Sequence, residues 1–165
     1  MKFLFLLAAM LGLAACMGSG GVDTTAESKV SQSLAVIDNS PDRTFSGMLN
    51  GVRSVYGSAP VTYDMRLGVA ARRHADDMLA NDFFDHKGSD GSTVETRVRD
   101  ADYNWTAVGE NIAKGYADEE AVLKGWVNSP DHQRNNVNPS FEDFALARAG
   151  TGSNSYWVLV LAAEQ

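Results

Sequence analysis

The sequence predicts an α+β fold, because helical patterns fill most of the chain and strand patterns follow at its end. Apolar residues recur at three- and four-residue spacing between about residues 45 and 79, which is typical of amphipathic helices. Two apolar runs, residues 144–147 and 156–161, flank a loop rich in glycine and serine and predict a β-hairpin. Helices followed by strands indicate α+β layering. With 165 residues, 44% of them hydrophobic and 21% charged, one globular domain is expected.

The first residues predict a secretory signal. Lys2 precedes an apolar run, Phe3 to Leu13, which is shorter than the roughly 20 residues that a membrane-spanning helix needs. The run ends in Leu-Ala-Ala-Cys, which closely resembles a bacterial lipobox, so we expect residues 1–15 to be a lipoprotein signal peptide and Cys16 to be lipidated. The alternative is an ordinary signal with an incidental cysteine. Met17 after the cysteine favours sorting to an outer membrane of the bacterial cell envelope.

Cys16 is the sole cysteine, which excludes an intrachain disulfide and a multi-cysteine metal cluster. The formal net charge of −7 and the pI of about 4.8 argue against nucleic-acid binding, because an acidic surface repels phosphates. Residues 16–41 are rich in glycine, serine and threonine and predict a flexible tether. Its one apolar patch, residues 34–37, is expected to dock on the domain that follows.

Four helices are expected within the domain, which we assign to residues 42–165. The first opens at Pro41-Asp42 and stops near Gly57. The second has the strongest pattern and begins at the N-cap Asp64. A capping box of Ser92 and Glu95 predicts a short third helix to about residue 101. Asp118 caps the fourth, which runs to Ser129-Pro130.

Three histidines and one glutamate could carry chemistry. His86 follows two phenylalanines and precedes a glycine-rich turn, His132 follows Ser-Pro-Asp, and Glu110 lies between Gly109 and Asn111. Together these three side chains could form a divalent-metal site or an acid–base pair. The alternative is that the histidines are unrelated. His74 lies on the apolar stripe of the second helix, where a packed histidine is expected rather than a cleft residue. The chain has no H-E-x-x-H or G-x-S-x-G motif.

Several motifs, in order, resemble bacterial CAP-domain (SCP-like) proteins over about residues 43–165. They are Phe83–Gly91, Arg97–Arg99, Gly109–Ala113, Ser129–His132 and Tyr156–Val158. The resemblance implies a three-layer α-β-α sandwich with a central antiparallel sheet. It also implies a cleft in which many members hold a divalent metal with two histidines and two acidic residues.

Carried over to this sequence, the resemblance assigns the cleft to His86, Glu110 and His132, with the two histidines as metal ligands. The second acid is not evident, because Asn128 or Ser129 stands where relatives carry glutamate. Asp131 stands where bacterial relatives usually have glycine. We therefore expect any metal, such as Zn or Mg, to be weakly held.

Three functions compete at this point. The favoured one is a non-enzymatic envelope module, anchored to the membrane by its lipid, that binds a small apolar ligand, a divalent metal, a small lipid or a partner protein. The second is a metal-assisted hydrolase with the metal on His86 and His132 and Glu110 as the base. The third is a structural or adhesion lipoprotein whose cleft is vestigial.

Overall fold

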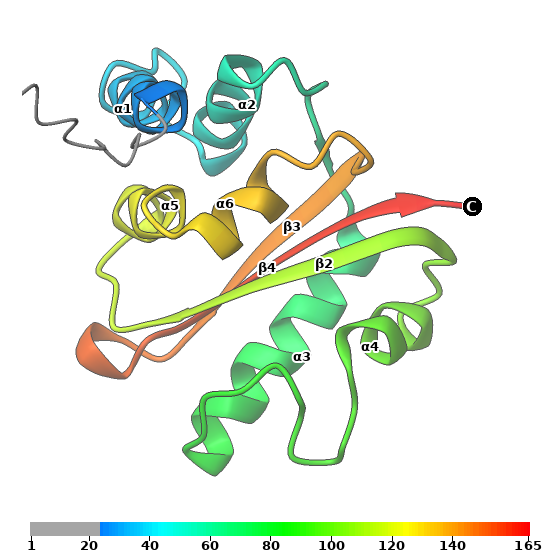
Figure 1. Cartoon of the computed structure of the whole chain (residues 1–165). Helices are drawn as coiled ribbons and strands as arrows, with labels where there is room; N and C mark the ends of the chain where they lie inside the picture. The colour runs from blue at the N-terminus through cyan, green and yellow to red at the C-terminus, as the bar shows by residue number, and fades with distance from the viewer. Residues whose placement is uncertain (1–23) are drawn as a thin grey trace, which may run out of the picture.

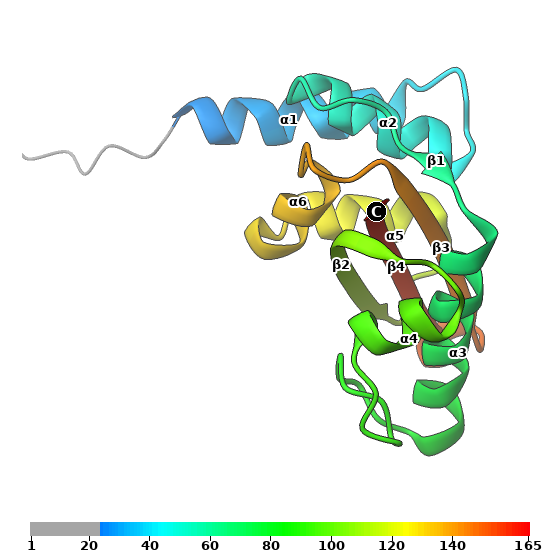
Figure 2. The ribbon, with the colours of Figure 1, turned by 90° about the vertical axis from the view of Figure 1, so that its right-hand side faces the viewer.

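The computed structural model describes residues 24–165, so the expected signal peptide, Cys16 and Met17 lie outside the described residues. It is a three-layer sandwich, with a sheet between two layers of helices (Figures 1 and 2). The strands are β1 (Thr62–Tyr63), β2 (Trp105–Lys114), β3 (Asp143–Ala149) and β4 (Tyr156–Glu164). One layer holds α1 (Thr24–Asp38), α2 (Phe45–Val55), α5 (Glu119–Val127) and α6 (Pro130–Asn136). The other layer holds α3 (Met65–Asn81) and α4 (Val94–Asp100).

The sheet has the order β1-β3-β4-β2, and its three long strands are antiparallel. This confirms both the predicted central antiparallel sheet and the β3–β4 hairpin. Only the two-residue β1, which the sequence did not predict, runs parallel to its neighbour β3. Along β4, alternate side chains enter the two cores: Trp157, Leu159 and Leu161 face α1, α2 and α5, while Val158 and Val160 face α3.

Two of the four expected helix starts are confirmed and two are shifted. The first helix begins at Phe45 rather than at Pro41-Asp42, because Thr44 is its N-cap and accepts from the Gly47 N–H. Asp64 accepts from the backbone N–H groups of Arg66 and Leu67, and Asp118 accepts from that of Ala121. The predicted Ser92–Glu95 capping box is wrong by one residue, because the N-cap of α4 is Thr93 and its partner is Thr96. The Ser92 carbonyl instead closes the preceding loop by accepting from the Gly88 N–H at 2.9 Å.

Strand β2 and helix α6 were not predicted, for different reasons. Helices cover both faces of β2, so it lacks the polar–apolar alternation of a half-exposed strand and carries Gly109, Glu110 and Asn111 at its centre. Helix α6 is seven residues long and mostly polar, which leaves no apolar stripe to detect.

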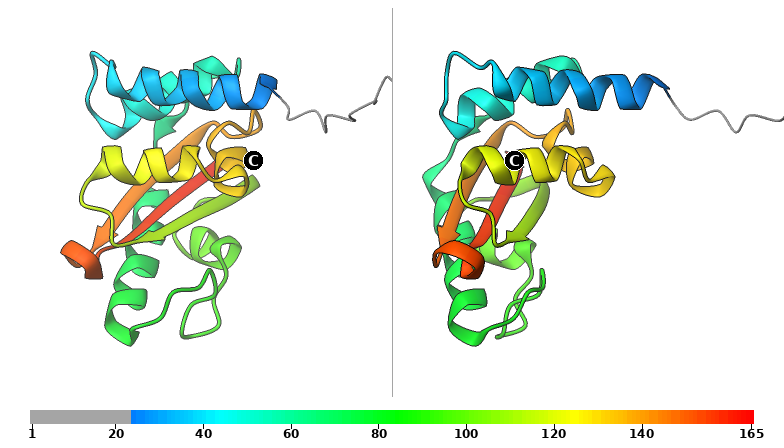
Figure 3. Two further views of the ribbon diagram at one scale, coloured as in Figure 1. Left: turned by 60° about the vertical axis from the view of Figure 1, so that its left-hand side comes forward. Right: turned by 90° about the vertical axis from the view of Figure 1, so that its left-hand side faces the viewer.

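The prediction of a flexible tether through residue 41 is wrong for residues 24–38, which form the 15-residue helix α1. The polar composition hid a stripe of Val30, Ser33, Leu34 and Ile37, whose spacing matches successive helical turns. Helix α1 lies beside α2 and α5 (Figure 3). Its stripe packs against these helices, and Ile37 is fully buried in their core. The expected docking of residues 34–37 is thus confirmed for Ile37. Within residues 24–165, no helix is both long and apolar enough to cross a membrane.

Because α1 belongs to the folded core, Ile37→Ala is expected to lower the free energy of unfolding by about 2–5 kcal/mol. The matched control is Ser31→Ala, at an exposed position on the same helix, which should change it by less than about 0.5 kcal/mol. Urea denaturation of both variants measures the difference. Equal stability of the two variants would mean that α1 does not contribute to the cooperative core.

Candidate functional site

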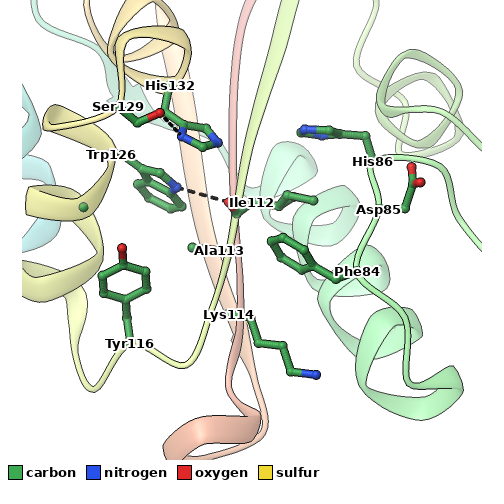
Figure 4. Close-up of a pocket in the computed structure, with 11 residues that line it drawn as sticks. Phe84, Asp85, His86, Ile112, Ala113, Lys114, Tyr116, Trp126, Ser129 and His132 are labelled. Atoms are coloured by element: carbon green, nitrogen blue, oxygen red, sulfur yellow. Dashed lines mark hydrogen bonds between the residues drawn. The ribbon is translucent and has the colours of Figure 1, made fainter.

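A pocket of about 500 Å³ opens between the two helical layers, beside strand β2 (Figure 4). One wall comes from the loop that follows α3, with Phe84, Asp85 and His86. The opposite wall comes from α5 and α6, with Trp126, Ser129 and His132. The base is β2 itself, from Ile112 to Lys114, and Tyr116 and Gly125 complete the lining. The pocket therefore joins apolar and aromatic surface to two imidazoles that face each other from different layers.

His86 is held at three points although its side chain is 58% exposed. Its Nδ1 lies 2.8 Å from Glu110 Oε1, and because a carboxylate only accepts, this nitrogen carries the proton. The preceding carbonyl, of Asp85, lies 2.9 Å from His74 Nε2, and the carbonyl of His86 accepts from Arg97 at 3.1 Å. The other ring nitrogen, Nε2, is left for the pocket. The Glu110 hydrogen bond raises the pKa of His86 above its usual value.

Glu110 lies behind His86 rather than in the pocket. Its side chain is 2% exposed, its Oε1 accepts from His86, and its Oε2 accepts from the buried Arg97 at 2.7 Å. The ion pair with Arg97 compensates the cost of burying the carboxylate. Gly109 beside it is required by close packing, because a Cβ there would come within 2.9 Å of the Phe141 ring.

His74 is a fully buried histidine on the apolar stripe of α3, as expected. The Asp85 carbonyl can only accept, so His74 donates from Nε2, and its Nδ1 has no partner among the described residues. Burial lowers its pKa, which agrees with a neutral ring. His74 does not line the pocket, but it fixes the backbone next to His86.

His132 stands in the first turn of α6, which begins at Pro130. Its Nδ1 lies 2.8 Å from Ser129 Oγ, and the ring points toward His86 (Figure 4). Burial, and secondarily the charge of His86, lower the pKa of His132. The structure brings His86 and His132, but not Glu110, to the lining of one pocket, and their surroundings shift their pKa values in opposite directions.

A set of asparagines that the sequence analysis did not identify joins α6 to β2. Asn111 Nδ2 donates to the His132 carbonyl at 3.0 Å and to Asn136 Oδ1 at 2.9 Å. Asn135 Nδ2 donates to the Glu110 carbonyl at 3.2 Å. Asn111 follows Glu110 in the Gly-Glu-Asn motif, and this motif was the sequence feature that could have identified it. Through Glu110, which contacts His86, and the buried Asn111, which contacts the His132 carbonyl, this motif positions both walls of the pocket.

The donor set does not fit a resident metal held by protein side chains. No group of three or more His, Cys, Asp or Glu side chains within residues 24–165 is placed to hold a metal ion. A catalytic zinc site uses about three protein ligands, and the two histidines and Asp85 that line this pocket are not placed as such a group. Glu110, expected as a ligand or base, has both oxygens engaged by His86 and Arg97. We therefore derive no step through a metal.

The profile of the Cysteine-rich secretory protein family, CAP, matches residues 47–161, and the chain belongs to this family. It is 31% identical over 106 residues to the uncharacterized protein YkwD of Bacillus subtilis, covering 64% of this chain and 41% of that protein. It is 27% identical over 105 residues to the uncharacterized membrane protein YlbC of the same organism, covering 64% and 30%. The chain thus spans less than half the length of these curated relatives.

Solved structures share the fold. A Bacillus anthracis extracellular protein containing a SCP domain superposes with a TM-score of 0.66 and 24% identity, over 74% of this chain and 40% of that one. An outer surface protein of Borrelia burgdorferi gives a TM-score of 0.65 and 20% identity, over 71% and 87%. Helix α1 precedes the residues that the family profile matches.

The opposite pKa directions predict the order in which the two pocket histidines titrate. In an NMR titration, His86 is expected to bind its proton at a higher pH than His132. Glu110→Gln should lower the pKa of His86, because the anionic acceptor is lost. In the control Ser129→Ala, the pKa of His86 should remain higher than that of His132. A His86 that titrates below His132 in the unmodified protein would contradict the Glu110 contact.

The same shifts fix the sign of each histidine's effect on stability. The pKa of His86 is raised in the folded protein. The stabilisation that His86 gives the fold is therefore fully present below its ordinary pKa of 6.5, and it is lost as the pH rises through the folded pKa. The pKa of His132 is lowered in the folded protein. The stabilisation that neutral His132 gives the fold is therefore present above pH 6.5, and it is lost as the pH falls through the folded pKa.

Proposed function

We propose that this CAP domain is a non-enzymatic binding module of the bacterial cell envelope whose ligand enters the His86–His132 pocket. The observation that carries the proposal is the combination of an apolar and aromatic lining with two imidazoles that keep one nitrogen open. A ligand with an apolar body would contact Phe84, Ile112 and Trp126. Its polar group would bind the two histidines, one a donor when protonated and the other an acceptor when neutral.

The location is the extracytoplasmic side of an envelope membrane, through a lipid on Cys16. The Leu-Ala-Ala-Cys sequence supports this anchor, and Met17 favours an outer membrane. Relatives described as an extracellular protein, an outer surface protein and a membrane protein are compatible with it. Two or more acyl chains give stable membrane attachment, whereas one gives only reversible binding.

Hydrolysis is the second candidate, and the specific observation that favours it is the pair of histidines with separated pKa values. Pairs of titratable groups pushed apart in this way serve as acid and base in many enzymes. His132 also contacts the Ser129 hydroxyl, which lies on the same wall of the pocket. Against it, Glu110 is closed off by Arg97 and no three-donor metal group exists in the described residues.

Lipid anchoring predicts that Cys16→Ser moves the protein from the membrane fraction to the soluble fraction, because the modified thiol is lost. Cell fractionation and the intact mass measure this outcome, and Ser19→Ala nearby is the matched control. Membrane retention of Cys16→Ser with no change in mass would refute the anchor.

A binding role predicts that protein purified from its own envelope retains a small molecule that native mass spectrometry detects. His86→Ala and His132→Ala should each reduce that retention by at least about tenfold, the size of a lost hydrogen bond to a charged or buried group. Arg134→Ala, an exposed position on the same helix as His132, should retain it.

The same four proteins, solubilised in detergent as full chains, are then screened with ester, peptide and glycoside substrates, with and without Zn²⁺ or Mg²⁺. We expect no turnover above buffer. Turnover that disappears in both histidine variants and persists in Arg134→Ala would replace the binding role with the hydrolase.

A further inference from the structure

Strand β2 lies at the edge of the sheet and, among residues 24–165, pairs with β4 alone. Its ladder runs Lys114 opposite Tyr156, Ile112 opposite Val158 and Glu110 opposite Val160. Directly beyond this ladder, the Gly115 N–H donates to the Ser155 carbonyl at 2.8 Å, which makes positions 115 and 155 a hydrogen-bonded pair. Because such pairs alternate along an antiparallel ladder, residues 113, 111 and 109 bond to β4. The backbone groups of residues 114, 112 and 110 therefore point away from the sheet.

Side chains of the α5–α6 layer confirm this orientation. The Ile112 carbonyl accepts from Trp126 Nε1 at 3.3 Å, and the Glu110 carbonyl accepts from Asn135 Nδ2 at 3.2 Å. These helices thus satisfy the outward carbonyls of Glu110 and Ile112. The outward N–H groups of Glu110, Ile112 and Lys114 are left without an acceptor among the described residues. Three donors, about 6.6–6.8 Å apart along the strand, form a row.

Two pockets follow this row. The His86–His132 pocket has residues 112–114 as its base, and a second pocket of about 390 Å³ has residues 108–110. Both pockets include Asp85 and His86, so the histidine stands between them. We call the combined surface along residues 108–114 the β2-edge groove. Residues 108 to 114 are six steps of about 3.3 Å apart, roughly 20 Å, so an extended hexapeptide covers most of the groove.

We propose that the β2-edge groove binds an extended polypeptide segment, whose carbonyls accept from the N–H groups of Glu110, Ile112 and Lys114. The proposal rests on the proposed binding function of the His86–His132 pocket and names its ligand class. Main-chain pairing gives such complexes their affinity, and pockets for alternate side chains give specificity. Here Phe84, Trp126 and Tyr116 form the apolar receptor for one such side chain.

The groove favours a single peptide segment over a second copy of this domain. The edge lies between walls that rise from both helical layers, with His86 on one side and His132 on the other (Figure 4). A lone extended strand can enter between these walls. The edge of a second sheet carries its own helical layers and would collide with them. A compact small molecule would reach one or two of the donors but could not match the whole row.

The test uses the ¹⁵N-labelled full chain in detergent micelles and a pool of blocked hexapeptides, with threonine at five positions and a varied third residue. Expected are shifts of the Glu110, Ile112 and Lys114 amides and at least tenfold slower hydrogen exchange at these amides. Asn111 and Ala113 are internal controls, because their N–H groups already bond to β4. A pool N-methylated at every amide should produce neither effect, since the methyl groups prevent close strand pairing.

Lys114→Pro removes one outward N–H at an edge position, where proline is tolerated, and Lys114→Val removes the charge but keeps the N–H. Proline is expected to weaken the pool's binding about fivefold relative to valine, the effect of one hydrogen bond. If Lys114→Pro fails to fold, the proposal is still tested by hydrogen exchange in the unmodified chain, which compares the outward amides with those of Asn111 and Ala113.

Three results would each overturn the peptide proposal. The amides of Asn111 and Ala113 could respond as strongly as those of Glu110, Ile112 and Lys114, the N-methylated pool could bind as well as the unmethylated pool, or neither pool could produce a response. The two proposals fail separately. If peptides leave the edge amides unchanged while the protein retains a small molecule through His86 and His132, the binding function stands and its peptide ligand does not.

Discussion

The buried ion pair between Glu110 and Arg97 is the contact on which the pocket depends. Both side chains are almost fully buried, so neither charge is tolerable without the other, and loss of one partner from such a pair costs about 3–5 kcal/mol. The pair connects β2 to α4, and the same guanidinium holds the carbonyls of His86 and Ser92. The position of an exposed histidine is therefore set by an interaction of the interior, which explains how a loop residue keeps one orientation.

The two pocket histidines are held in the same way but by different partners. Each has Nδ1 held by a protein group and Nε2 left open, with a buried carboxylate behind His86 and a neutral hydroxyl behind His132. The carboxylate stabilises the imidazolium of His86, while burial and the charge of His86 outweigh the nearby Asp131 and favour the neutral ring of His132. Two chemically identical side chains thus differ in charge over part of the pH range, so the two walls of the pocket present imidazoles in different protonation states.

The sequence predicts the parts of this fold that local patterns encode. Helices α2, α3 and α5 carry apolar stripes and capping residues, and the hairpin of β3 and β4 carries two apolar runs around a turn. The shared pocket of His86 and His132 was expected from motif resemblance. The role of Glu110 was not, because Arg97 stands 13 residues away and their contact exists only after β2 packs on α4. A carboxylate in a glycine-flanked motif looks the same in sequence whether it faces a ligand or supports a histidine.

Strand β2 was the hardest element to predict and is also the one that creates the site. A strand covered on both faces carries small and polar residues wherever side chains of other elements must reach it, and here Asn111 and Glu110 serve opposite layers. Their side chains point to opposite faces because successive strand residues alternate. One dipeptide at the edge of the sheet consequently positions both walls, Asn111 through α6 and Glu110 through the His86 loop. Since each wall belongs to a different helical layer, the width of the pocket is set by the sheet between them, and a change at either residue would alter one wall while leaving the other in place.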